Sequence, residues 1–144
     1  MTFADLYYIV WKFREHIGSY PNATDCLESA VKKSIEAMEH MIDGEMNVNV
    51  DYDLAEVLVM TMTAFGNKYP YHLLEGSCGL YVREPCVREI ITSCSAALSA
   101  EIEGDWKKRD IWLEQVGFQI EFIVEDIGER LIEVCNDLIL MEKK

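Results

Sequence analysis

Hydrophobic residues recur every three or four positions along most of the 144-residue chain, which is the period of a helix that buries one face. Near the N-terminus this pattern predicts a helix over residues 3–17, closed by Gly18. A second helix is predicted to begin at a capping pair, Asp25 and Glu28, and to end at Gly44. This helix carries one apolar stripe of Leu27, Val31, Ile35, Met38 and Ile42.

Two more helices are predicted in the middle of the chain. The third covers Asp53 to Phe65, and residues 45–51 before it are expected to form a loop because a single short strand has no partner. The fourth is predicted to begin at Pro85, since proline suits the first helical position, and to end at Gly104. Its other faces carry small uncharged residues: Ser93, Ser95, Ala96, Ser99 and Ala100. We therefore expect this fourth helix to be buried on all sides.

The helical spacing continues from Ile111 almost to the C-terminus, and Gly128 is the predicted break between two final helices. No paired strand pattern, internal repeat or linker interrupts the chain. A chain of this length suits one domain with one core. The sequence thus predicts a single all-α domain over residues 1–144, a helical bundle around a central apolar helix.

The charge of the chain narrows the classes of partner. Asp and Glu number 26 against 13 Lys and Arg, a formal net charge of −13, so nucleic acid and anionic membrane surfaces repel the chain at long range. The one basic cluster, residues 107–109, lies among acidic residues and is interpreted as a solvated face. We expect neither nucleic-acid binding nor a membrane anchor, because no apolar run is long enough to span a bilayer.

The five cysteines are odd in number and include no CxxC pair, which favours free thiols in a reducing compartment over a disulfide framework. No secretory leader is recognisable. We therefore expect a cytoplasmic protein. The common enzyme signatures are missing from the sequence, and the histidines, His16, His40 and His72, have no metal-ligand spacing. We expect no catalytic residue, metal or cofactor; the alternative, a helical enzyme, would be detected by metal analysis.

Methionines are concentrated in the second and third helices, at positions 38, 41, 46, 60 and 62. Flexible thioether side chains are common on surfaces that accept several helical partners. They also fill irregular cores, and the sequence does not decide between these two roles. The apolar and aromatic content further suggests a homodimer.

Residues 5–13 run apolar and then basic, and Gly18-Ser19-Tyr20 follow with a glycine near an aromatic residue. Together with residues 85–88 and 122–128, this segment resembles the Bcl-2 family, in the compact form found in large DNA viruses, and it resembles the family's N-terminal homology helix. Residues 85–88, Pro-Cys-Val-Arg, stand where the family has Asn-Trp-Gly-Arg, and a run of small residues follows at 95–100. Residues 122–128, Phe-Ile-Val-Glu-Asp-Ile-Gly, resemble the second groove motif.

The resemblance implies an inhibitor of apoptosis in the host-cell cytoplasm. Such a protein holds the amphipathic death-motif helix of host pro-apoptotic Bcl-2 proteins in a groove built by the second to fourth helices. Arg88 maps onto the family's ligand-binding arginine, and the implied groove residues are Arg88, Val87, Glu84, Met38, Met41, Met60, Phe65 and Ile91. A plain surface ion pair of Arg88 with Glu84 or Glu89 is the alternative interpretation.

The sequence also departs from the family pattern. Cys86 and Val87 replace Trp and Gly, so the bulkier Val87 is expected to narrow the ligand's approach. A second viral branch carries Tyr-Ile-x-Trp in its first helix, and Tyr8-Ile9-Val10-Trp11 matches that signature. That branch inhibits innate immune (NF-kappa-B) signalling, often with a closed groove. Inhibition of apoptosis and of immune signalling are therefore both kept as hypotheses.

Overall fold

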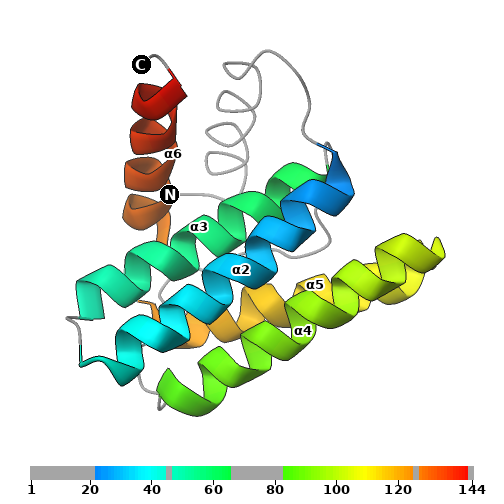
Figure 1. Ribbon diagram of the computed structural model, residues 1–144, viewed down its shortest axis with the longest axis horizontal. Helices are drawn as coiled ribbons and strands as arrows, with labels where there is room; N and C mark the ends of the chain where they lie inside the picture. Colours follow the sequence, from blue (N-terminus) through cyan, green and yellow to red (C-terminus); the bar gives the residue numbers. More distant parts are fainter. Residues whose placement is uncertain (1–21, 45–46, 66–82, 125–126, 143–144) are drawn as a thin grey trace.

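The computed structural model describes residues 22–44, 47–65, 83–124 and 127–142 (Figure 1). These ranges form helices and their short connections, and they contain no strand. The helices are α2 (Ala23–Ile42), α3 (Asn47–Phe65), α4 (Arg83–Glu103), α5 (Trp106–Ile123) and α6 (Ile127–Glu142). The prediction of an all-helical bundle is confirmed for the described residues. The helix predicted over residues 3–17 lies outside them.

Both ends of α2 are capped by the residues flanking it. The Asn22 side chain accepts a hydrogen bond of 2.7 Å from the backbone N–H of Thr24, so Asn22 caps the helix and the predicted capping pair of Asp25 and Glu28 is wrong. At the other end Gly44 has a φ of 77°, a left-handed conformation that glycine adopts without strain. The predicted helix end at Gly44 is confirmed.

α3 begins at Asn47 rather than at Asp53, so the loop predicted over residues 45–51 is wrong from residue 47 onward. Burial explains the difference, because Val50 continues the helical spacing of Leu54 and Leu58 and all three are fully buried. From residue 50 to residue 63 every side chain except Tyr52 and Met60 is buried. α3 is therefore the most enclosed of the described helices.

α4 is not enclosed on all sides, and that prediction is wrong. Its buried face is formed by Val87, Ile90, Cys94 and Ala97, whereas Arg88, Thr92, Ser95 and Ser99 face solvent. Small side chains on an uncharged helix face suit both burial and exposure, and here Ser93 and Ala100 are buried while Ser95 and Ser99 are exposed. Pro85 lies in the first turn, where proline is tolerated, but the helix begins at Arg83.

α4 and α5 form an antiparallel hairpin with a very short turn (Figure 1). Gly104 has a φ of 79°, and the N–H of Asp105 donates to the carbonyl of Ala100 at 2.9 Å. This is the hydrogen-bonding pattern that ends many helices. The Asp105 carboxylate then accepts from the N–H of Lys108 at 3.1 Å and so caps the start of α5. The predicted end at Gly104 is confirmed.

Two helices follow, as predicted, but the break between them precedes Gly128. α5 ends at Ile123, because the next residue, Val124, has an extended backbone, and α6 begins at Ile127. Gly128 therefore lies in the first turn of α6. The branched side chain of Val124 is fully buried. Its packing, rather than a glycine, therefore fixes the change of chain direction between α5 and α6.

The five helices share one core. α2 packs on α3 and on α4, α4 packs on α5, and α6 packs on α3 at a steep angle (Figure 1). α2 and α4 lie side by side and antiparallel, so the C-terminal end of α2 is next to the N-terminal end of α4. None of the described helices has the length and apolar character needed to cross a bilayer.

Candidate protein-binding surface

The apolar stripe predicted along α2 is only partly buried. Ile35 is 42% exposed and Ile42 is 74% exposed, while Val31 and Met38 are partly buried against the core. We call these four residues the α2 ridge. The prediction that they form the buried stripe of the helix is therefore wrong for Ile35 and Ile42.

Small side chains occupy the buried face of α2 instead. Ala30, Ser34 and Ala37 are completely buried, together with Cys26 and Leu27. The Ser34 hydroxyl donates to the carbonyl of Val31 within the helix at 2.7 Å, so its burial leaves no unsatisfied donor. Small residues let α2 lie close to its neighbours, and the larger apolar residues remain at the surface.

Polar contacts show which way the α2 ridge faces. Lys33 and His40 pair with residues of α3, so they mark the flank of α2 that lies against α3. Ile35 and Ile42 each follow one of these residues by two positions, which is about 200° around a helix. The ridge therefore lies on the opposite flank, along the side on which α2 meets α4.

Four of the predicted groove residues contact the same core. Met38 and Met41 on α2, Met60 on α3 and Ile91 on α4 are all partly buried and pack against it. Each therefore helps to fill the core and leaves part of its side chain accessible, and a role in partner binding stays a prediction for each. Met38 and Met41 lie on α2 and Ile91 lies on α4, its neighbour, whereas Met60 lies on α3.

Val87 and Phe65 differ from that group. Val87 is fully buried within the core, so the residue that the resemblance sets against the family's glycine is a packed side chain. Phe65 is the last residue of α3, and its side chain lies outside the described part of the structure. No surface at Val87 is available to a ligand without movement of the core.

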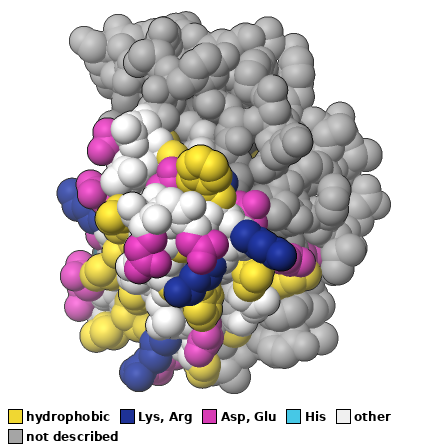
Figure 2. Space-filling model, turned by 90° about the vertical axis from the view of Figure 1, so that its right-hand side faces the viewer, with side chains coloured by type: hydrophobic (Ala, Val, Ile, Leu, Met, Phe, Trp, Pro, Cys, Tyr) yellow, Lys and Arg dark blue, Asp and Glu magenta, His cyan; other side chains and the backbone are white. Residues whose placement is uncertain are grey.

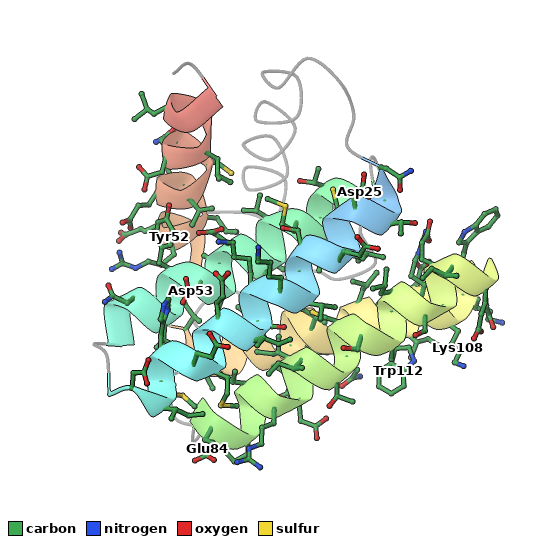
Figure 3. All side chains as sticks on the ribbon, viewed as in Figure 1. Asp25, Tyr52, Asp53, Glu84, Lys108 and Trp112 are labelled. Carbon is green, nitrogen blue, oxygen red and sulfur yellow. The ribbon has the colours of Figure 1, made fainter. Side chains whose placement is uncertain are left out.

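Arg88 and Glu84 form an ion pair at the start of α4. The Arg88 Nη2 lies 2.6 Å from the Glu84 Oε1, one helical turn away, and the two side chains are 70% and 57% exposed. Figure 3 places Glu84 at the N-terminal end of α4. Of the two acidic partners that the sequence offered, the structure selects Glu84 over Glu89. Arg88 is accessible to a ligand, at the same end of the bundle as Ile42.

A polar seam between α2 and α3 was not predicted. The Lys33 Nζ lies 3.2 Å from Glu36 and 3.4 Å from Glu56, and His40 pairs closely with Asp53. Figure 3 shows Asp53 between α3 and α2. The signal was present in the sequence, since Asp53 and Glu56 interrupt a strongly apolar helix and buried carboxylates need partners.

Burial controls the protonation of this seam. It raises the pKa of Asp53 and of Glu56, and the opposing attractions to His40 and Lys33 only partly offset that effect. For Lys33, burial lowers the pKa, but attraction to Glu56 and Glu36 outweighs burial and the net pKa is raised. These groups hold α2 on α3, on the flank opposite the α2 ridge.

A second polar contact joins α3 to α6. The Tyr52 hydroxyl donates to the Asp137 carboxylate at 2.9 Å, and Figure 3 shows Tyr52 directed toward α6. Burial raises the pKa of Tyr52, and the hydrogen bond to Asp137 raises it further. The tyrosine is thus a neutral donor that fixes the steeply inclined α6 on the bundle.

The thiols of the described cysteines do not have the properties of nucleophiles. Cys26, Cys86, Cys94 and Cys135 are all buried. Burial raises the pKa of Cys94 and of Cys135 to about 12, so both are protonated at neutral pH. Within the described residues no group of three or more His, Cys, Asp or Glu side chains is arranged to hold a metal ion.

Other large apolar side chains are exposed near the α4–α5 turn. Ile102, Trp106 and Ile111 belong to this set. Figure 2 shows this end of the molecule, where hydrophobic side chains are separated by acidic and basic ones. The α2 ridge is different, because its four residues follow one another at helical spacing along a single helix.

Comparisons with known proteins leave the function to be inferred from these residues. A scan against protein-family models, a search of curated proteins and a search of solved structures found no match to the chain.

Proposed function

We propose that this chain is a binding protein of the Bcl-2 type, which suppresses apoptosis by holding the amphipathic death-motif helix of a host protein against α2 and α4. One observation carries the proposal: the α2 ridge exposes Ile35 and Ile42 at helical spacing beside α4. A continuous apolar ridge on one helix is the surface on which an amphipathic helix docks its own regularly spaced apolar residues.

Arg88 supports the same assignment by its position. It is exposed at the N-terminal end of α4, next to the C-terminal end of α2, where the ridge ends at Ile42. An acidic residue of a bound helix that displaces Glu84 would gain a charge-assisted hydrogen bond with the guanidinium. That contact would fix the register of the apolar residues along the α2 ridge.

A variant of Arg88 separates this role from that of a surface ion pair. Arg88→Glu should abolish binding of a death-motif peptide, because losing one partner of a desolvated interface pair costs roughly 2 to 5 kcal/mol, about thirtyfold or more in affinity. The exposed pair itself contributes at most about 1 kcal/mol to stability, and an acid in the first turns of a helix is well tolerated. The melting temperature should therefore hardly change.

The measurement is a titration of fluorescently labelled death-motif peptides with the wild-type protein and the variant. Arg130→Glu is the matched control, since Arg130 pairs with Glu133 on α6, far along the chain from the α2 ridge. It should leave binding unchanged. Binding of the peptide to Arg88→Glu with wild-type affinity would remove Arg88 from the site.

Inhibition of innate immune signalling is the second candidate function, and the complete burial of Val87 favours it. A packed valine at this position closes the place where a death-motif helix approaches the family's proteins most deeply. Tyr8-Ile9-Val10-Trp11, the sequence signature of that branch, lies outside the described residues. If no isolated pro-death peptide binds while a folded signalling protein does, this second function replaces the first.

A further inference from the structure

The charges along the α2 ridge are arranged on one side of its apolar residues. Glu28 precedes Ile35 by seven residues, and Glu39 follows it by four, so both lie on nearly the same face of α2 as Ile35. Both glutamates are exposed, as is Asp43 at the end of the helix. Lys32 is the one exposed base on this part of α2. The outer edge of the ridge is therefore mainly acidic.

Among the side chains that the structure describes at the adjoining end of α4, the one positive charge is paired. Arg88 is paired with Glu84, and Glu89 beside it is exposed. Arg88, Glu84 and Glu89 together carry a net charge of −1. A helix lying along the α2 ridge thus meets an apolar line bordered by carboxylates on α2 and at the start of α4.

We infer that the α2 ridge selects an amphipathic helix whose apolar positions are flanked by Lys and Arg. This inference rests on the proposed function and specifies the chemistry of the partner. Carboxylates that flank an apolar contact attract cationic side chains and disfavour acidic ones, and this complementarity governs association rate and specificity more than total affinity. A single acidic residue placed for Arg88 is compatible with such a helix.

A second copy of the chain is a poorer occupant of the ridge. Two α2 ridges packed face to face would bring Glu28 and Glu39 of both copies together, and two chains of net charge −13 repel each other. An anionic membrane surface is disfavoured for the same reason. A cationic helix is the occupant that relieves the repulsion among these carboxylates.

Two peptides of identical apolar register, one with Lys and one with Glu at the flanking positions, provide the test. The Lys peptide should bind more tightly by about two- to fivefold for each charge facing Glu28 or Glu39, the range of an exposed ion pair. The advantage should shrink as salt rises from about 0.15 M to 1 M, because the screening length falls from about 8 Å to 3 Å.

Variants attribute the preference to the ridge rather than to the acidic chain as a whole. Glu28→Gln with Glu39→Gln should remove most of the difference between the peptides, whereas Glu103→Gln with Glu129→Gln, exposed acids elsewhere, should retain it. Ile42→Ser should weaken binding of both peptides. Equal loss of preference in the two double variants would overturn the inference, because the effect would then be non-specific.

The outcomes distinguish the inference from the function on which it rests. If both peptides bind with equal affinity at every salt concentration, the charge selection is wrong and the binding function stands. If neither peptide binds, the proposed function is wrong as well. If Ile42→Ser alters the sedimentation of the protein alone, a second copy covers the ridge and the inference is overturned.

Discussion

At the scale of single residues, side-chain size separates the faces of α2: the small Ala30, Ser34 and Ala37 lie in the core, and the larger Ile35 and Ile42 lie at the surface. The small residues Ala30, Ser34 and Ala37 were not recognised as the buried face of α2, because the hydrophobic pattern favours the larger Ile35 and Ile42. Periodicity places apolar residues on one helix face but does not say whether that face meets the core or a partner. The partly buried methionines left the same question open.

The polar seam between α2 and α3 makes the free energy of unfolding depend on pH, and the raised pKa of Glu56 gives the direction of that dependence. Burial raises the pKa of Glu56 above its ordinary value of 4.5. The folded protein therefore keeps the Glu56 carboxyl protonated at pH values where the same group in the unfolded chain has lost its proton. The free energy of unfolding should therefore rise as the pH falls from neutral through the raised pKa. The stabilisation is complete once the pH is below the ordinary value, where both states are protonated.

Glu56→Gln should flatten that rise, because glutamine does not titrate. Urea unfolding of the variant and the wild type at several pH values between 7 and 4.5 measures the effect. Glu129→Gln, an exposed residue of α6, is the control and should keep the wild-type slope. An unchanged slope in Glu56→Gln would show that other groups produce the dependence.

At the scale of the elements, the sequence predicted which segments form helices but not which helix is the most buried. Gly44 and Gly104 marked helix ends correctly, because each has the left-handed backbone that glycine favours. The start of α3 was missed because its first turns alternate valine with polar residues, which resembles a strand. The low charge of α4 suggested a central helix, whereas α3 has the more enclosed position.

Hydrogen exchange of the native protein should accordingly be slowest in α3. Its amides from residue 50 to residue 63 lie on a helix enclosed by α2, α5 and α6, so their exchange should require the largest opening of the bundle. The solvent-facing residues of α4, such as Thr92 and Ser99, should exchange faster. Slower exchange in α4 than in α3 would restore α4 as the central helix.

At the scale of the whole molecule, the net charge and the exposed apolar residues have opposite effects on self-association. The expectation of a homodimer stays a prediction, with the exposed Ile102, Trp106 and Leu140 as apolar contacts outside the α2 ridge. Sedimentation should show dimers at micromolar concentration that strengthen with added salt, because salt screens the repulsion between two chains of charge −13. A protein that stays strictly monomeric at high concentration contradicts this expectation.

The central claim is that the α2 ridge holds a partner helix, and one pair of substitutions tests it most directly. Ile42 and Leu140 are both large, apolar and exposed, at 74% and 59%, but only Ile42 belongs to the ridge. Replacing either with serine removes an exposed side chain, so stability should change by no more than about 0.5 kcal/mol. In a titration with a death-motif peptide, Ile42→Ser should lose roughly 1 to 2 kcal/mol of binding energy, about five- to thirtyfold in affinity, and Leu140→Ser should bind as the wild type does. Equal affinities of the wild type and Ile42→Ser would contradict the account.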